Sequence, residues 1–136
     1  MLIEEAVANR LKTHAGLSAL IGASIYPQRL PQGATGLPLP AVTYTKITGP
    51  RVHAMVADTT LASPTFQVSC WSSTYKTLID VAEQVRKALQ DFTGVMGGAG
   101  GVSVDRAFIE NEVDLDFEPD AQVYQRALDF VIWHHE

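Results

Sequence analysis

The sequence closes with two predicted strands and no helix between them. These strands cover residues 102–109 and 123–133, and Tyr124, Leu128, Phe130 and Ile132 of the second share one parity, as side chains on a core-facing side do. When two consecutive strands are joined without a crossover helix, they lie side by side in the sheet and run antiparallel. This ending excludes a regular strand–helix alternation and predicts an α+β fold built on an antiparallel sheet.

Two earlier segments also predict strands. Residues 41–47 are rich in β-branched and aromatic side chains, and residues 65–71 alternate apolar with polar positions. Cys70 lies on the apolar parity of the second segment, which predicts a small buried side chain and not a nucleophile. Together with the closing pair, these segments give a sheet of about four strands.

Helical periodicity occurs twice. Apolar side chains recur at intervals of three and four through residues 75–92, and the first sixteen residues carry an apolar stripe with charged residues outside it. Residues 17–21 leave room for a short additional turn. The expected architecture is therefore α+β, with an antiparallel sheet of about four strands, two main helices packed on one face, and a single domain over residues 1–136.

Three segments predict connections without regular structure. Prolines recur through residues 27–40 and exclude a helix there, so this segment is expected to be an ordered loop. Residues 48–63 show no clear period and exceed the usual loop length. The glycine-rich run at residues 94–101 lacks side chains that could build a core, which predicts a flexible connection.

The composition excludes several classes of protein. The 136 residues are 46% hydrophobic and 18% charged, which is typical of a compact domain and not of a disordered tail. The single cysteine excludes an internal disulfide and a cysteine-built zinc site. The chain shows neither a membrane-spanning apolar run nor a secretory signal, so it is expected to be soluble and intracellular, without membrane contact.

The residues predict no catalytic or metal site. The four histidines lack metal-ligand spacing, and His134 and His135 are expected to be a solvated strand end. A nucleophile elbow, a phosphate-binding loop and a dinucleotide fingerprint are all missing from the sequence. We therefore expect no enzyme activity, no metal and no cofactor. A small hydrolase or transferase would need a nucleophile and base that the sequence does not pair.

A row of acids is the most unusual local feature. If extended, it places carboxylates on one side and an apolar strip on the other, and without it the chain, at net charge −5, is nearly neutral. The chain has no basic cluster, which disfavours direct nucleic-acid binding. The row predicts a solvated hairpin, a functional surface facing a basic neighbour or an enclosed passage, or a cation site. Its carboxylates belong to Glu110, Glu112, Asp114, Asp116, Glu118 and Asp120.

Several ordered landmarks resemble one known family. The string IYPQRLPQGATGLPLPAVTYTKITG at residues 25–49, the strand FQVSCW followed by S-x-Y and a long helix, and the closing strand YQRALDFVIW stand in the same order and spacing. The chain resembles the tail completion proteins of long-tailed phages, prophages and gene transfer agents over nearly its full length.

The resemblance implies a structural role in a virion tail, assembled in the bacterial cytoplasm. It implies a ring, commonly a hexamer, at the head-proximal end of the tail tube, where it terminates tube growth and joins the tail to the head connector. The implied partners are copies of the chain, the tail tube protein, the head–tail connector protein, and DNA that passes through the lumen without specific binding. The alternative is another ring protein of phage morphogenesis, such as a head–tail adaptor, a minor tail protein or a tube subunit.

Two segments are candidates for the ring contacts, because each subunit of a ring presents two different patches. They are the unpatterned loop at residues 48–63 and the apolar side of the acidic row. The six carboxylates are candidates for facing the lumen, where they would repel DNA phosphates. The candidate contact residues are Arg51, Val52, His53, Met55, Val56, Val113, Leu115 and Phe117.

Overall fold

The computed structural model describes residues 2–22, 24–27, 40–49, 51–53, 58–98, 100–118 and 123–135. These residues form three helices and eight strands in an α+β arrangement. In chain order, the elements are α1 (Ile3–Thr13), α2 (Ala15–Ile21), β1 (Ile25–Pro27), β2 (Ala41–Thr48), β3 (Arg51–His53), β4 (Asp58–Ala62), β5 (Thr65–Ser72), α3 (Tyr75–Leu89), β6 (Gly94–Met96), β7 (Val102–Glu118) and β8 (Val123–His135).

The strands form one sheet with β8 at its centre. β5 pairs with one side of β8, and β7 pairs with the other side along almost its whole length, which confirms the predicted closing hairpin. β4 lies end to end with β5 on the same side of β8 and pairs with the last residues of β8. β1 runs parallel to β2, whereas the other pairings are antiparallel, so the sheet is mixed.

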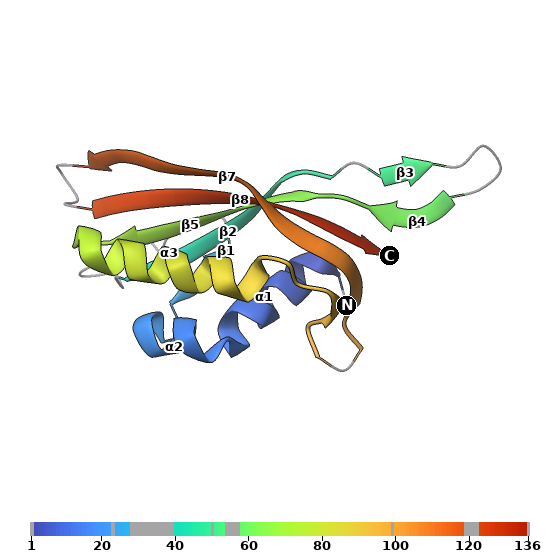
Figure 1. Cartoon of the computed structure of the whole chain (residues 1–136), viewed down its shortest axis with the longest axis horizontal. Coiled ribbons are helices and arrows are strands. Elements are labelled where there is room, and N and C mark those ends of the chain that lie inside the picture. The colour runs from blue at the N-terminus through green and yellow to red at the C-terminus, as the bar shows by residue number, and fades with distance from the viewer. Residues whose placement is uncertain are drawn as a thin grey trace.

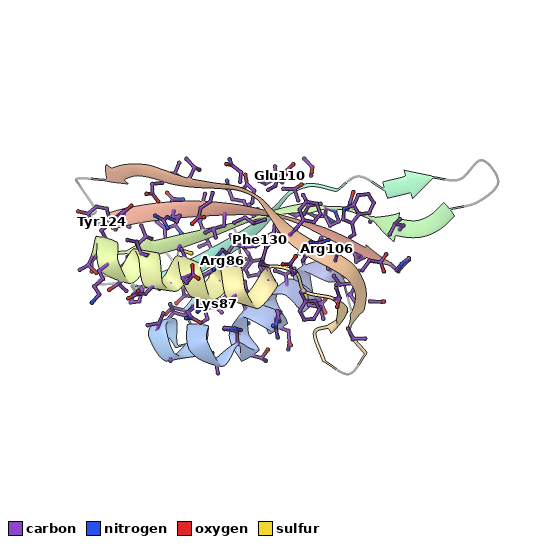
Figure 2. The ribbon with its side chains drawn as sticks, viewed as in Figure 1. Arg86, Lys87, Arg106, Glu110, Tyr124 and Phe130 are labelled. Atoms are coloured by element: carbon purple, nitrogen blue, oxygen red, sulfur yellow. The ribbon has the colours of Figure 1, made fainter. Side chains whose placement is uncertain are left out.

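All three helices lie on one face of this sheet, as predicted (Figure 1). Phe66 of β5 stands opposite Phe130 of β8, and both side chains are fully buried under the helices. Figure 2 shows Phe130 between the sheet and α3. The core is therefore a single layer between the helices and one side of the sheet, and the side chains that α3 contributes to it are Leu78, Val81, Ala82, Val85, Ala88 and Leu89.

The predicted numbers of strands and helices were too low. β1, β3 and β6 have only three residues each, which is too short for any period to be recognised. The third helix is α2, which is separated from α1 by His14 in an extended conformation. The Nδ1 atom of His14 accepts a hydrogen bond from the N–H of Leu17 (3.3 Å), so this residue caps a second helix instead of ending the first alone.

The glycine-rich run also differs from its prediction. Its first residues form β6, which pairs with the start of β7, and Met96 is completely buried. A Cβ atom on Gly101 would stand 2.2 Å from the carbonyl oxygen of Met96, so only glycine fits this turn. The run is a tight hairpin because glycine permits the required backbone conformations. Most of the predicted loop at residues 27–40 lies outside the described residues.

Two buried side chains bear on the predicted chemistry. Cys70 is fully buried, and burial raises the pKa of its thiol, which is consistent with an inert core residue. His134 is 1% exposed, so the expectation of a solvated end was wrong there, because the apolar parity of β8 continues to this residue. Within the described residues, no helix is long and apolar enough to cross a membrane, and no group of three potential metal ligands occurs.

Candidate assembly surfaces

The segment between β2 and β5 forms a two-stranded ribbon. β3 and β4 pair through Arg51 with Ala62 and His53 with Asp58, with a register shift between the two pairs. Figure 1 shows that they extend beyond the helices at one end of the sheet. We call residues 51–53 and 58–62 the arm. The arm replaces the predicted loop at residues 48–63, whose short strands carry no recognisable period.

The arm carries part of the predicted contact set. Arg51, Val52 and His53 lie on β3, whereas Met55 and Val56 lie outside the described residues. β3 pairs with β4 and is the last strand in its direction of the sheet. The arm is therefore a projecting element whose outer side is available to another molecule.

At the opposite end of the sheet, β7 continues through the acidic row. The sequence predicted a strand over residues 102–109, but β7 runs to Glu118 and stays paired with β8. We call residues 110–118 the acidic segment. Glu110, Glu112 and Asp114 are exposed, Asp116 and Glu118 lie on the strand, and Asp120 lies outside the described residues.

The acidic segment does not place all its carboxylates on one side. Register shifts occur between Ile109 and Asn111 and again between Leu115 and Glu118. Each shift inserts a residue and changes which face the following side chains occupy. Glu112 and Asp114 stand opposite helix-side positions of β8, whereas Figure 2 shows Glu110 on the side of the sheet away from the helices. The expected single row of six carboxylates is thus interrupted.

One arginine joins the acidic segment to the rest of the fold. Arg126 of β8 stands opposite Asp114, and its Nη2 atom lies 3.2 Å from Asp114 Oδ2. Its Nη1 atom donates to Glu112 Oε1 at 3.2 Å. The hydroxyl of Tyr75, at the start of α3, donates to Asp114 Oδ2 at 2.7 Å. The network therefore ties β7, β8 and α3 together at one point.

The network sets the charge state of its members. Hydrogen bonds from Arg126, and then from Tyr75, lower the pKa of Asp114, while the hydrogen bond to Asp114 raises the pKa of Arg126. Two carboxylates of the acidic segment are consequently compensated by one cation. Glu112, Asp114 and Arg126 line a shallow open hollow of about 280 Å³.

Sequence reasoning missed Arg126 and Tyr75. The signal for Arg126 was present, because it shares the parity of Tyr124, Leu128 and Phe130 on the core-facing side of β8. A positively charged side chain on the core-facing side of a strand needs a negatively charged partner. The carboxylates of the acidic row are the nearest such groups in the sequence. Tyr75 is the first residue of a helix, and its position in the sequence does not indicate a polar partner.

The face of the sheet opposite the helices carries exposed apolar side chains in the acidic segment. Val113 is 43% exposed and Leu115 is 44% exposed, and they stand opposite Ala127 and Gln125 of β8. Phe117 lies further along the same strand. The predicted apolar strip is therefore exposed at Val113 and Leu115, beside the carboxylates.

These features define a class of protein. The sheet bears helices on one face, an arm at one end and a charged, partly apolar strand at the other. The described residues therefore form a small α+β domain.

Comparison with known proteins identifies the family. Residues 5–135 match the family described as "Tail completion protein gp17", so the chain belongs to this family. It is a structural tail component of a virion and not an enzyme. The family therefore confirms the role that the resemblance implied and the expectation, drawn from the residues, of no enzyme activity.

A solved structure supports the fold assignment. The fold is similar to a chain of the "Virion of native gene transfer agent (GTA) particle", with a TM-score of 0.68 and 21% identity over 98% of this chain and 95% of that one. A search of curated proteins finds no match to the sequence.

Proposed function

We propose that the chain forms a ring at the head-proximal end of the tail tube, where it terminates tube growth and joins the tail to the head connector. The family resemblance implies six copies in this ring. The observation that carries the proposal is the presence of two different candidate surfaces at opposite ends of one sheet: the arm and the acidic segment. Two unlike patches allow head-to-tail contacts, and such contacts close into a ring when the rotation between subunits permits.

Removing the gene tests this role in the particle. Electron microscopy of a lysate without the protein is expected to show tails of uncontrolled length and heads without attached tails. Complementation with the wild-type gene serves as the control. Filled heads left unjoined beside tails of normal length would instead favour a head–tail adaptor, and particles of normal morphology would contradict the proposal.

We also propose that the acidic segment contributes negative charge to the lumen and limits the adhesion of passing DNA. Glu112 and Asp114 are compensated by Arg126, so charge reversal at Asp114 would place two cations together and disturb the fold. Glu110 is exposed, and Asp116 lies further along the strand.

The double variant Glu110→Lys with Asp116→Lys tests the lumen proposal. It is expected to assemble into particles but to eject or deliver DNA less efficiently, because cations in the passage attract phosphates. The neutral variant Glu110→Gln with Asp116→Asn is the matched control, with a smaller effect. Wild-type transfer of DNA by particles that carry both lysines would contradict a lumenal position.

A further inference from the structure

The sheet has two stretches of outer backbone edge that meet no other described strand. One is the acidic segment of β7, and the other comprises Thr45 to Thr48 of β2 together with Arg51 to His53 of β3. β1 pairs with β2 only from Val42 to Tyr44, and the strand order ends at β3. A free edge presents a row of N–H and C=O groups to which a further strand can be added.

The described residues cover the outer edge of β7 as far as Ile109. β6 pairs with residues 102–104, and the N–H of Asp91 donates to the carbonyl oxygen of Ala107 at 2.8 Å. The N–H of Ile109 donates to the side-chain oxygen of Gln90 at 2.8 Å. Beyond Ile109, no described strand lies on this side of β7. In the part of the chain that the structure describes, the outer edge of the acidic segment is therefore unpaired.

The register shows which residues of the acidic segment direct their N–H groups outwards. The N–H of Ile132 donates to Pro64 on the β5 side, so neighbouring odd-numbered residues of β8, such as Ala127, direct their groups towards β7. Val113 stands opposite Ala127, so the backbone N–H and C=O groups of Val113 face β8. Its neighbour Glu112 points its N–H away from the sheet.

The same alternation applies to the other free edge. Ala62 of β4 stands opposite His134 of β8 and also opposite Arg51 of β3. Because the backbone groups of Ala62 face β8, those of Arg51 point away from β4. On β2, the N–H of Val42 donates to the carbonyl oxygen of Ser24, next to β1. The backbone N–H of Lys46, four residues later, therefore points to the same outer side.

The two free edges carry opposite charges. The acidic segment bears only acids among its ionisable residues, whereas the edge of β2 and β3 bears Lys46, Arg51 and His53 and no acid. Lys46 also pairs with Glu4 of α1, and its Nζ atom lies 3.0 Å from Glu4 Oε1. Two acidic edges repel each other, which disfavours pairing between identical edges. An acidic edge and a basic edge attract each other.

We propose that the acidic segment of one copy pairs with the outer edge of β2 and β3 in the next copy, so that the sheet continues from subunit to subunit. The proposal rests on the ring proposed above and specifies the contact that builds it. β2 and β7 run in opposite directions within the sheet, so the added pair is antiparallel. Figure 1 shows the arm and the end of β7 at opposite ends of the molecule, which makes the association head-to-tail.

Proline substitutions test the contact without touching the internal pairing. Proline removes an N–H, and at an outward-facing position this group serves only an added strand. Glu112→Pro and Arg51→Pro are each expected to abolish rings and leave a monomer on a sizing column with light scattering. Glu112→Ala and Arg51→Ala remove the same side chains but keep the N–H, so both are expected to form rings.

A mixture of the two proline variants gives the sharper result. Each variant keeps one intact edge, so the mixture is expected to form a one-to-one heterodimer and nothing larger. Circular dichroism establishes that each variant is folded. Rings formed by either proline variant would overturn the proposal, and so would folded variants that remain monomeric when mixed.

Hydrogen exchange on the wild-type chain supplies a test that needs no substitution. Backbone N–H groups within residues 45–53 and 110–118 are expected to exchange at least about tenfold more slowly in the ring than in the diluted monomer. A ring in which both segments exchange as in the monomer would overturn this contact but leave the proposed function standing. A chain that stays monomeric at every concentration, alone and with the tube protein, would contradict both.

Discussion

At the scale of single residues, Arg126 determines how the acidic segment is held. Its guanidinium group binds Glu112 and Asp114, and the hydroxyl of Tyr75 donates a second hydrogen bond to Asp114. Asp114 and Glu112 are about two-fifths exposed, so solvent screens these ion pairs. The network positions the strand and contributes modestly to the stability of the fold.

A double-mutant cycle on Asp114→Asn and Arg126→Met measures this contribution. At pH 7 the coupling is expected to be about 1 kcal/mol in the free energy of unfolding. The pKa of Asp114 is lowered in the folded state, so the coupling is fully present above the unfolded pKa of about 4. It is lost as the pH falls through the lower folded-state pKa.

Denaturant unfolding across the acid range provides the measurement. Glu110→Gln, at an exposed position of the same strand, is the control, and its stability is expected to stay within about 0.5 kcal/mol of the wild type. A coupling that persists unchanged at pH 2 would contradict the assignment of Asp114 as the titrating partner.

The sequence alone predicted the core residues better than the polar network. Phe66, Cys70 and Phe130 followed from strand alternation because burial acts on every second position. Arg126 required the register between β7 and β8, which three irregularities shift by one residue each. Periodicity within one strand does not determine that register.

At the scale of elements, long strands and helices were predictable and short ones were not. β5, β8 and α3 are long enough for their apolar side chains to show a period. β3 and β6 have three residues each, so only their pairing with β4 and β7 defines them as strands. The contact candidates stay predictions. One of their two segments differs from its prediction, because the loop expected at residues 48–63 contains the two strands of the arm.

Shortening the arm tests its role in assembly. Deleting Val52 to Asp58 is expected to give a folded monomer that no longer forms rings, since β5, β7 and β8 retain their pairing in the core. The unfolding temperature is expected to fall by no more than about 4 °C, the shift that corresponds to roughly 1 kcal/mol.

The matched control replaces Val52 to Asp58 by a glycine–serine segment of the same length. It preserves the length of the chain but removes the arm's side chains and its tendency to form strands, and it is expected to lose ring formation as well. Sizing chromatography with light scattering reports both results. A deletion variant that forms rings like those of the wild type would count against the arm.

At the scale of the whole molecule, the core lies apart from the two proposed contact elements. The helices and the sheet face beneath them contain the core, whereas the arm and the acidic segment extend towards opposite ends. Changes at the two ends are therefore expected to alter association more than folding. The charge difference between the ends also favours head-to-tail contacts over symmetric pairs.

The central claim is that the chain acts by binding copies of itself and a tube end. Native mass spectrometry of the purified protein, alone and with the tail tube protein, tests it most directly. We predict one closed ring of a single stoichiometry, which binds the tube protein as an intact unit. A monomer in both samples, or an open ladder of oligomers without a preferred size, would contradict it.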